Sequence, residues 1–367
     1  MKKQPDILII GGGIMGCATA LHLKKNGMAP AIIEQFSIGS GASGVNAGTL
    51  SLQIKRVALM PYAIAGHHLW EQAGRLVGFQ KTGGITLAFT EQEATLLHQR
   101  MQKKIQAGAP INFLTNKQIK KIEPKLTDKV VAASYCAEDG FANASLTGHY
   151  YRTLLKQANI SVYESCQVEK ITYQANQYQL TTNQGEFSAP RLLMATGAWL
   201  KNTAALLNID LPVNARVNTV SVTERAPRLV SQVIGHATGL LTLKQKKNGT
   251  VLIGGGWQGK GQPVNGSGQV NMQTLIPNLQ LAQYALPPLN QLRIVRSWTG
   301  YEANVPDFYP LAGAINGFEN LFILGCVRGG YTIGPYISQL MGEFILQRET
   351  ALPLFDPNRF LQSSSKE

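Results

Sequence analysis

The sequence predicts an α/β fold with a buried parallel sheet and a second, antiparallel sheet. Residues 7–10, "ILII", form the continuous apolar run that parallel strands show when both of their faces are buried. A glycine-rich turn, a helical segment and a second apolar run, "AIIE" at 31–34, follow in the order of a βαβ unit. Alternating runs such as "VNTVSVTE" and "TVLIGG" indicate antiparallel strands. A chain of 367 residues is long enough for two domains.

The turn after the first strand matches the GxGxxG pattern at Gly11, Gly13 and Gly16. In a dinucleotide-binding turn, the first glycine allows the sharp bend and the second lets the backbone approach a pyrophosphate. The third lets the helix pack against the strand. Residues 17–25 have helical apolar spacing, and Gly27 ends that helix. Because strand, turn, helix and second strand occur in order, the segment predicts a nucleotide site.

Glu34 indicates which nucleotide binds. It lies 23 residues after Gly11, where a carboxylate accepts hydrogen bonds from an adenosine ribose and would repel a 2′-phosphate. The alternative for this N-terminus is an export signal, because "MKK" is positively charged and "IMGC", ending at Cys17, has the form of a lipoprotein cleavage site. Pro5, Asp6 and three consecutive glycines argue against that alternative.

A second GxGxxG match serves as an internal control. Gly254, Gly256 and Gly259 lie in "VLIGGGWQGKG", after an apolar strand. The following residues, "KGQPVNGSGQ", have no helical apolar period, so no helix N-terminus is expected there to hold a phosphate. We therefore expect a strand end with a glycine-rich loop, and a single dinucleotide site in the chain.

Composition excludes several classes of protein. Hydrophobic residues make up 44% and charged residues 15%, as in ordinary globular chains, and no 18-residue apolar run predicts a membrane span. The four cysteines have no CxxC spacing and predict buried thiols in a reducing, cytoplasmic compartment, without a metal site. His67 and His68 are expected on a helix surface and its edge, because metal-binding histidines on a helix use i, i+4 spacing.

The net charge of +13 comes from scattered basic pairs and from the cluster Lys244–Lys247, which precedes a predicted hairpin turn. No aromatic residues alternate with that cluster, so it does not form a stacking platform for nucleic acid. We expect a solvated basic surface and no nucleic-acid role. Peripheral contact with the inner face of a membrane stays open as an alternative.

Residues 36–51, "FSIGSGASGVNAGTLS", are small enough for the backbone to lie against a large flat ligand. Together with "GGGIMGCATALHLKKNG" and "IIEQ", this segment resembles the FAD half of the D-amino-acid oxidase superfamily. The segments "CAEDGFANASLTGHYYRTL", "RLLMATGAW", "RSWTGYEANVPDFYPLAG" and "LFILGCVRGGYTIGP" extend the resemblance over nearly the whole chain. The central "VTERAP" and "LKQKKNGTVLIGGGW" are most similar to the branch of glycine oxidase, hydrogen cyanide synthase and the opine or hydroxyproline dehydrogenase flavin subunits.

The resemblance implies a discontinuous Rossmann-like FAD-binding domain of the glutathione-reductase type, with an inserted antiparallel-sheet α+β substrate domain. The expected FAD-binding domain comprises residues 1–75, 140–212 and 300–352, the substrate domain 76–139 and 213–299, and a polar, frayed tail 353–367.

FAD is the implied cofactor, and its contacts are expected in the glycine turn, the second strand end, the small-residue segment and the C-terminal glycine segment. The expected FAD-binding residues are Gly11, Gly13, Ile14, Met15, Gly16, Glu34, Gln35, Ser43, Asn46, Ala47, Gly48, Thr49, Val168, Gly197, Gly325, Arg328, Gly329, Gly330, Tyr331, Thr332 and Ile333. The C-terminal glycines present a helix N-terminus, and the resemblance implies that it faces the flavin ring, where its dipole would favour the negative charge of the reduced ring.

The implied reaction removes a hydride from the carbon next to nitrogen, delivers it to flavin N5 and leaves an imine that water hydrolyses. A carboxylate-bearing substrate favours an arginine. Much of the family has one directly after its W-x-G segment, where this chain has Glu302. We expect Glu302 to face solvent, with contact to a cationic substrate arm, as in an opine, as the alternative. Arg328 is the expected replacement, with a salt bridge at the domain interface as its alternative role. Arg296, Tyr301 and Tyr331 are further catalytic candidates, each with a structural role as the alternative.

The electron acceptor and the partners follow from the same resemblance. Sarcosine oxidases use a lysine near the flavin to promote reaction with oxygen, and "TVLIGGGW" contains none. This favours a dehydrogenase that passes electrons to a protein or quinone, with oxygen as the alternative. A flavin subunit within a hetero-oligomer is also implied. Cys326 is not expected to anchor the flavin covalently. Glu302 keeps a second function open, that of an FAD-binding regulatory or assembly subunit without amine turnover.

Overall fold

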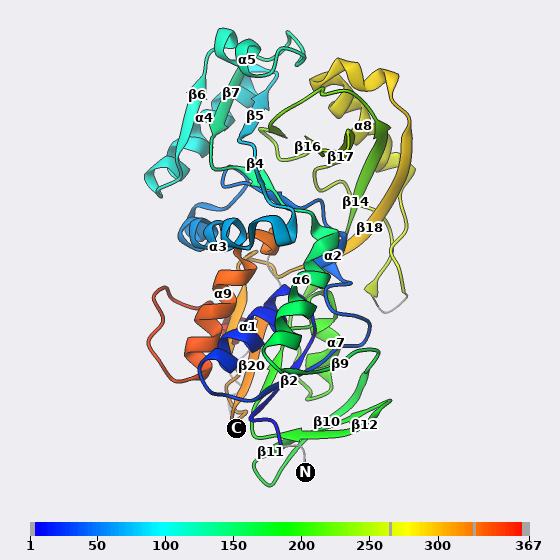
Figure 1. Cartoon of the computed structure of the whole chain (residues 1–367). Helices are drawn as coiled ribbons and strands as arrows, with labels where there is room; N and C mark the ends of the chain where they lie inside the picture. Colours follow the sequence, from blue (N-terminus) through cyan, green and yellow to red (C-terminus); the bar gives the residue numbers. More distant parts are fainter. Residues whose placement is uncertain (1–3, 264–265, 326–327, 362–367) are drawn as a thin grey trace. The chain divides into compact units, whose positions relative to one another are not determined.

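The computed structural model describes residues 4–263, 266–325 and 328–361. The chain folds into two compact units (Figure 1). Unit 1 comprises Met1–Val45, Ser145–Arg216 and Tyr301–Glu367, and unit 2 comprises Asn46–Ala144 and Val217–Gly300. Residues 46–75 and 140–144, which the sequence analysis placed with the FAD-binding domain, belong to unit 2. They do so because β3 (Thr49–Leu50) pairs with β8 (Gly140–Phe141), and β8 pairs with β4 (Gln80–Lys81).

Unit 1 is built on a six-stranded sheet whose order is β19-β20-β13-β1-β2-β9. Its strands are β1 (Ile7–Ile10), β2 (Pro30–Ile33), β9 (Ser161–Tyr163), β13 (Leu192–Met194), β19 (Leu311–Ala314) and β20 (Leu321–Gly325). All neighbouring pairs are parallel except β19 with β20. Every residue of β1, β2, β13 and β20 is buried, which confirms the Rossmann-like core expected from their unbroken apolar runs.

Helix α1 (Ile14–Lys25) packs against α9 (Gly330–Ile345) on this sheet (Figure 1). Small residues of α9 permit the close approach. A Cβ added to Gly342 would lie 2.5 Å from the His22 ring, and one added to Gly334 would lie 3.0 Å from Ile14. The remaining elements of unit 1 are α2 (Ala42–Val45), α6 (Ala144–Gln157), α7 (Leu200–Ala205) and the small antiparallel sheet of β10 (Val168–Gln174), β11 (Gln177–Thr182) and β12 (Gly185–Ala189).

Unit 2 carries most of an eight-stranded sheet with the order β18-β14-β17-β16-β15-β5-β7-β6. Its strands are β5 (Gly84–Ala88), β6 (Ile111–Leu114), β7 (Ala132–Cys136), β14 (Asn214–Arg225), β15 (Val233–His236), β16 (Thr242–Gln245), β17 (Thr250–Gly254) and β18 (Ile294–Asn304). Apart from the parallel pair β5–β15, the pairs with a defined register are antiparallel. The helices are α3 (Met60–Ala73), α4 (Glu91–Gln106), α5 (Asn116–Ile122) and α8 (Met272–Ala285). The expected antiparallel α+β insertion is confirmed.

The C-terminal segment differs from the expected frayed tail. The Phe355 carbonyl accepts the backbone N–H of Ala312 in β19 at 2.8 Å, and the Phe355 ring stacks on Tyr309. Arg359 pairs with Asp307 at 2.8 Å. These contacts fix residues 353–361 against unit 1, and residues 362–367 lie outside the described part of the chain. Among the described helices, none combines the length and the apolar character needed to cross a membrane.

Candidate functional site

The glycine turn after β1 is fixed by close backbone packing. Gly11 has φ +110°, and a Cβ on it would lie 2.5 Å from the Ala195 carbonyl oxygen. A Cβ on Gly16 would lie 2.0 Å from the Gly11 carbonyl oxygen, so only glycine lets α1 start this close to β1. Helix α1 therefore begins at Ile14, three residues before the predicted start, and includes Met15.

The N-terminus of α1 is suited to an anionic ligand. Its N-cap, Gly13, has no side chain to accept the first N–H groups, and the first turn has no acidic residue. The Ser43 hydroxyl accepts the Ile14 N–H at 3.0 Å, which places this predicted residue at the turn. The remaining N–H groups and the helix dipole can bind a phosphate.

Glu34 lies at the carboxyl end of β2 and meets the glycine turn. Its Oε2 accepts the Gly12 N–H at 2.6 Å, and its Oε1 accepts the Phe36 N–H at 2.8 Å, across the intervening Gln35. Burial raises the pKa of this carboxyl, and the two backbone N–H groups oppose that rise. The Glu34 carbonyl accepts the Cys166 N–H at 2.8 Å, which brings the segment leading to Val168 beside this strand end. The ribose contact of Glu34 stays a prediction.

Two buried threonine hydroxyls at the same sheet edge have no partner among the described residues. Thr196 follows β13 and precedes Gly197, whose φ of +54° favours glycine, and Thr332 lies in the first turn of α9. Leaving a buried polar atom without a hydrogen bond costs about 1–3 kcal/mol. These two hydroxyls are therefore suited to form hydrogen bonds with a bound polar ligand. Sequence reasoning missed Thr196, although it lies directly before the predicted Gly197.

The N-terminus of α9 forms the second helix end at this edge. Gly329 is its N-cap with φ +75° and offers no capping side chain, and the first turn, Gly330 to Ile333, has no acid. Glu302 Oε1 accepts the Gly329 N–H at 2.9 Å and is partly buried. The expectation that Glu302 faces solvent was therefore wrong, because this carboxylate takes a backbone N–H of the helix cap.

Arg216 and Arg328 place positive charge near Glu302. Burial lowers the pKa of the Arg216 guanidinium, the charge of Arg328 lowers it further, and the charge of Glu302 raises it. Arg328 is exposed and follows Gly325, after two residues outside the described part of the chain. Sequence reasoning missed Arg216, since "VNARVN" carries no motif that marks its arginine. Two arginines within one charge cluster suit an anion, because guanidinium groups bind carboxylates through paired N–H donors.

The other predicted catalytic residues fall into both units. Tyr301 is buried in unit 1, with its ring edge-on to Trp199 at 5.8 Å between centroids. The Tyr331 hydroxyl hydrogen-bonds Thr147 Oγ1 at 2.9 Å, and burial raises its pKa. Arg296 is exposed in unit 2, with its guanidinium carbon 5.8 Å from the centroid of the Trp298 ring. The structure thus places Tyr301, Tyr331 and Arg328 in one unit and Arg296 in the other.

Four predicted FAD residues, Asn46, Ala47, Gly48 and Thr49, lie in unit 2. A Cβ on Gly48 would lie 2.0 Å from the Ala142 carbonyl oxygen, and Asn46 Oδ1 accepts the Gly48 N–H at 2.6 Å. This turn is therefore held against the β8 segment by backbone packing. The roles of these residues toward FAD stay predictions.

Lys244 corrects the expectation of a solvated basic cluster. It is fully buried in β16, which runs between β15 and β17, and its Nζ donates to Thr49 Oγ1 at 2.6 Å. Burial lowers its pKa to about 7, and the charge of Lys246 contributes. Of the three lysines in the cluster, only Lys247, at the tip of the hairpin, is exposed. The consecutive residues Leu243, Lys244 and Gln245 are all buried, so both faces of β16 are covered, which the run of basic letters does not reveal.

Two further expectations concern cysteine and the second glycine motif. Cys17, Cys136 and Cys166 are buried free thiols as predicted, and Cys326 lies outside the described residues. Strand β17 ends at Gly254, and the next α-helix in the described part of the chain is α8. The prediction of a strand end without a helix is confirmed.

Comparison with known proteins identifies the family of this chain. Residues 6–344 match the family described as FAD dependent oxidoreductase (DAO). The chain is 29% identical to glycine oxidase of Geobacillus kaustophilus over 96% of each chain, and the crystal structure of that enzyme superposes with a TM-score of 0.88 at 26% identity, covering 95% of this chain and 96% of that one.

Two other relatives extend this comparison. A subunit of opine oxidase from Rhizobium meliloti is 23% identical over 97% of this chain and 98% of its own length. L-proline dehydrogenase from P. horikoshii has a similar fold, with a TM-score of 0.90 at 24% identity over 98% of both chains. A large dinucleotide fits the glycine turn, the N-terminus of α1, whose N-cap glycine has no side chain, and the buried threonine hydroxyls that lack partners among the described residues. The family match over nearly the whole length shows that this chain belongs to the DAO family of FAD-dependent oxidoreductases, with FAD as its cofactor.

Proposed function

We propose that this protein is a dehydrogenase that oxidises the C–N bond of a small amino acid or secondary amine. The proposal rests on one observation above all: the charges of Arg328 and Glu302 both act on Arg216, and the Glu302 carboxylate accepts the Gly329 N–H at the N-terminus of α9. A pair of arginines suits the carboxylate of an amino acid. Relatives named for glycine, opine and L-proline oxidation support this substrate class. The absence of lysine from "TVLIGGGW" supports an acceptor other than oxygen.

Each residue of the cluster has a distinct part in this proposal. FAD, when bound, accepts the hydride from the substrate carbon. Arg328 and Arg216 hold the substrate carboxylate and so orient the carbon that loses hydride. Glu302 keeps the Gly329 N–H in place and balances the second arginine charge. The Tyr301 ring supplies an apolar surface that excludes water. The amine binds in its neutral form, so no side chain is required as a base.

The test is anaerobic reduction of the bound flavin. Glycine, sarcosine, L- and D-proline, other D-amino acids, hydroxyproline and an opine are added in turn while the visible spectrum is recorded. Bleaching by one of them identifies the substrate, and readmission of air shows whether oxygen reoxidises the flavin. We expect Arg328→Gln and Arg216→Gln to raise KM by about 10- to 100-fold, as expected for loss of a charge-assisted hydrogen bond. Arg348→Gln, which alters an exposed arginine of unit 1 beyond the C-terminal end of α9, is the matched control.

A regulatory or assembly role is the second candidate function. The observation that favours it is Glu302 at the position where much of the family has arginine. In that case FAD would bind but no amine would bleach it. The likeness to a subunit of opine oxidase also supports a hetero-oligomer. Purification of the native protein from its own cells by size-exclusion chromatography would show whether a partner chain elutes with it.

A further inference from the structure

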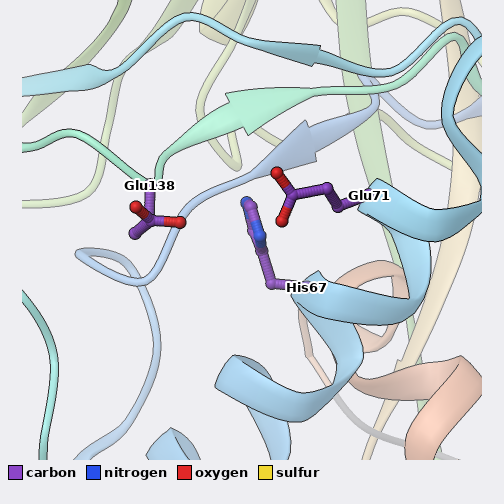
Figure 2. Close-up of side chains that lie close together, drawn as sticks. All are labelled: His67, Glu71 and Glu138. Carbon is purple, nitrogen blue, oxygen red and sulfur yellow. The ribbon is translucent and has the colours of Figure 1, made fainter.

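Three potential metal ligands meet in unit 2, and none of them is among the residues predicted to bind FAD or substrate. His67 and Glu71 lie four residues apart on α3, and Glu138 lies in the turn between β7 and β8. One ligand atom from each residue lies within 4.8 Å of the others. Figure 2 shows the His67 ring standing between the two carboxylates. A helix and a distant turn therefore direct one imidazole and two carboxylates to a common point.

His67 has an imidazole nitrogen without a hydrogen-bond partner among the described residues. Its side chain is buried, with 2% exposed, and Nε2 has no hydrogen-bond partner among the described residues. The ring is held edge-on to Phe79 with centroids 5.5 Å apart. An imidazole nitrogen without a partner among the described residues is available to a metal ion, and neutral imidazole is the commonest metal ligand in proteins.

The two carboxylates already hold a cation. Lys81 Nζ lies 2.6 Å from Glu138 Oε2 and 3.3 Å from Glu71 Oε1. This ammonium group pairs with both carboxylates, and His67 Nε2 forms no hydrogen bond to it or to any other described residue. The Lys81 side chain is 37% exposed, so it can move into water on its flexible stem. A divalent ion would bind all three side chains, whereas the Lys81 ammonium group pairs with only the two carboxylates.

We propose that His67, Glu71 and Glu138 bind a divalent transition-metal ion, with Zn²⁺ as the first choice, in exchange for the Lys81 ammonium group. One imidazole and two carboxylates suit Zn²⁺, which binds nitrogen and oxygen at about 2.0–2.2 Å, better than Mg²⁺ or Ca²⁺, which favour all-oxygen sites. Ligands at such distances around a tetrahedral ion lie about 3.4 Å apart, so binding requires only a small contraction. The metal would tie α3 to the β7–β8 turn.

The first test is titration of the FAD-loaded, full-length protein without a histidine tag, after dialysis against EDTA. Co²⁺ serves as the probe because its visible absorption reports nitrogen and oxygen ligation and shows charge-transfer bands if a thiol binds instead. Zn²⁺ is then used to displace it. We expect one equivalent per chain, with no thiol bands. Binding that is absent at millimolar Co²⁺ and Zn²⁺ would overturn the proposal.

Variants separate this site from general surface binding. His67→Ala and Glu138→Gln are expected to weaken Zn²⁺ binding at least about 10-fold, as loss of one of three ligands should. Glu138→Gln keeps the shape of the side chain should the alanine variant fail to fold. Lys81→Met removes the competing cation and is expected to tighten binding. His98→Ala, which alters an exposed histidine of α4, is the matched control. Equal affinity in all four variants would refute the site.

Discussion

The chain contains two glycine-rich strand ends that match the same GxGxxG pattern but have different structures. After β1, the glycines lead directly into α1, and a Cβ on Gly16 would lie 2.0 Å from a backbone oxygen. After β17, a loop follows, and the nearest atom to a Cβ on Gly254 is Thr242 Oγ1 at 3.4 Å. The first site needs its third glycine for a close helix–strand crossing. The third glycine of the second motif, Gly259, is also crowded, with a Cβ 2.3 Å from the Gln269 carbonyl oxygen, but that oxygen belongs to the bridged loop and not to a strand beside a helix, and at Gly254 there is space for a side chain. The pattern indicates a phosphate site only where a helix follows it.

The largest expected effect tests this comparison directly. Gly16→Ala would push α1 away from β1, so we expect FAD affinity to fall by at least about 1,000-fold, or about 4 kcal/mol. Gly254→Ala, at the first glycine of the second motif, where a Cβ would make only ordinary contacts, is the control and should keep FAD bound. Fluorescence titration of apoprotein with FAD measures both.

Loss of folding could imitate loss of FAD binding in the first variant. Gly13→Ala provides a milder case, since its Cβ would lie 3.3 Å from Ser43 Oγ, and it should weaken FAD binding while circular dichroism stays native. Equal FAD affinity for Gly16→Ala and Gly254→Ala would show that the two motifs do not differ in the way described.

Substitution of Lys244, on the strand next to β17, is expected to have an intermediate effect, on the pH dependence of the free energy of unfolding. Its pKa is lowered from 10.5 to about 7 by burial, so between these pH values the unfolded chain holds a proton that the folded chain lacks. The free energy of unfolding should therefore rise with pH, by roughly 1.4 kcal/mol per pH unit from this group. Lys244→Met should lack that rise, which makes a difference of about 3 kcal/mol between about pH 7.5 and 9.5. Urea denaturation at both pH values measures it.

Lys246→Met is the control for the same hairpin, because Lys246 is only partly buried and should change the slope less. If wild type and Lys244→Met show parallel pH profiles, Lys244 is charged in the folded protein and the proposed role of burial is wrong.

The smallest effect concerns the helix end at the sheet edge of unit 1. Glu302→Gln keeps an oxygen that can accept the Gly329 N–H but removes the negative charge beside Arg216. If the arginines bind the substrate carboxylate, KM should fall about threefold with little change in kcat, within the range of less than about 1 kcal/mol for partly exposed charge pairs. Glu302→Ala, which also removes the acceptor, should instead raise KM. A higher KM in the glutamine variant would contradict the assigned role of the charge.

The sequence predicted the parts of this molecule that rest on local patterns. Unbroken apolar runs identify β1 and β20 as buried strands, and the sterically required glycines identify the turn before α1. Glu34 was correctly placed at a strand end next to that turn, because its distance along the chain is set by one βαβ unit.

The rest depends on contacts between segments far apart in the chain. Arg216 is a candidate for the site only because the charge of Arg328 acts on it, and Lys244 is buried because β16 lies between two neighbouring strands. The expectation that His67 lies at a helix surface or its edge was wrong, because this side chain is buried; its i, i+4 neighbour on α3 is Glu71, and Glu138 comes from the β7–β8 turn. No local spacing links these residues.

Asp139 of the "DG" turn shows the same dependence on distant segments. It is buried, and it accepts hydrogen bonds from the Ser51 hydroxyl and the Leu52 N–H, which lie nearly ninety positions earlier in the chain. The turn letters predict a change of chain direction, but they do not identify the segment that this carboxylate holds.

The strand order of unit 1 has a consequence for biosynthesis. Strand β1 leaves the ribosome before its parallel neighbour β13, which begins only at Leu192, and before α9, which packs on α1 and begins at Gly330. A domain reaches its native packing only once all of its segments have been made. The nascent chain therefore carries the glycine turn with one edge of β1 open until β13 has been made, and unit 1 closes only after α9 has followed.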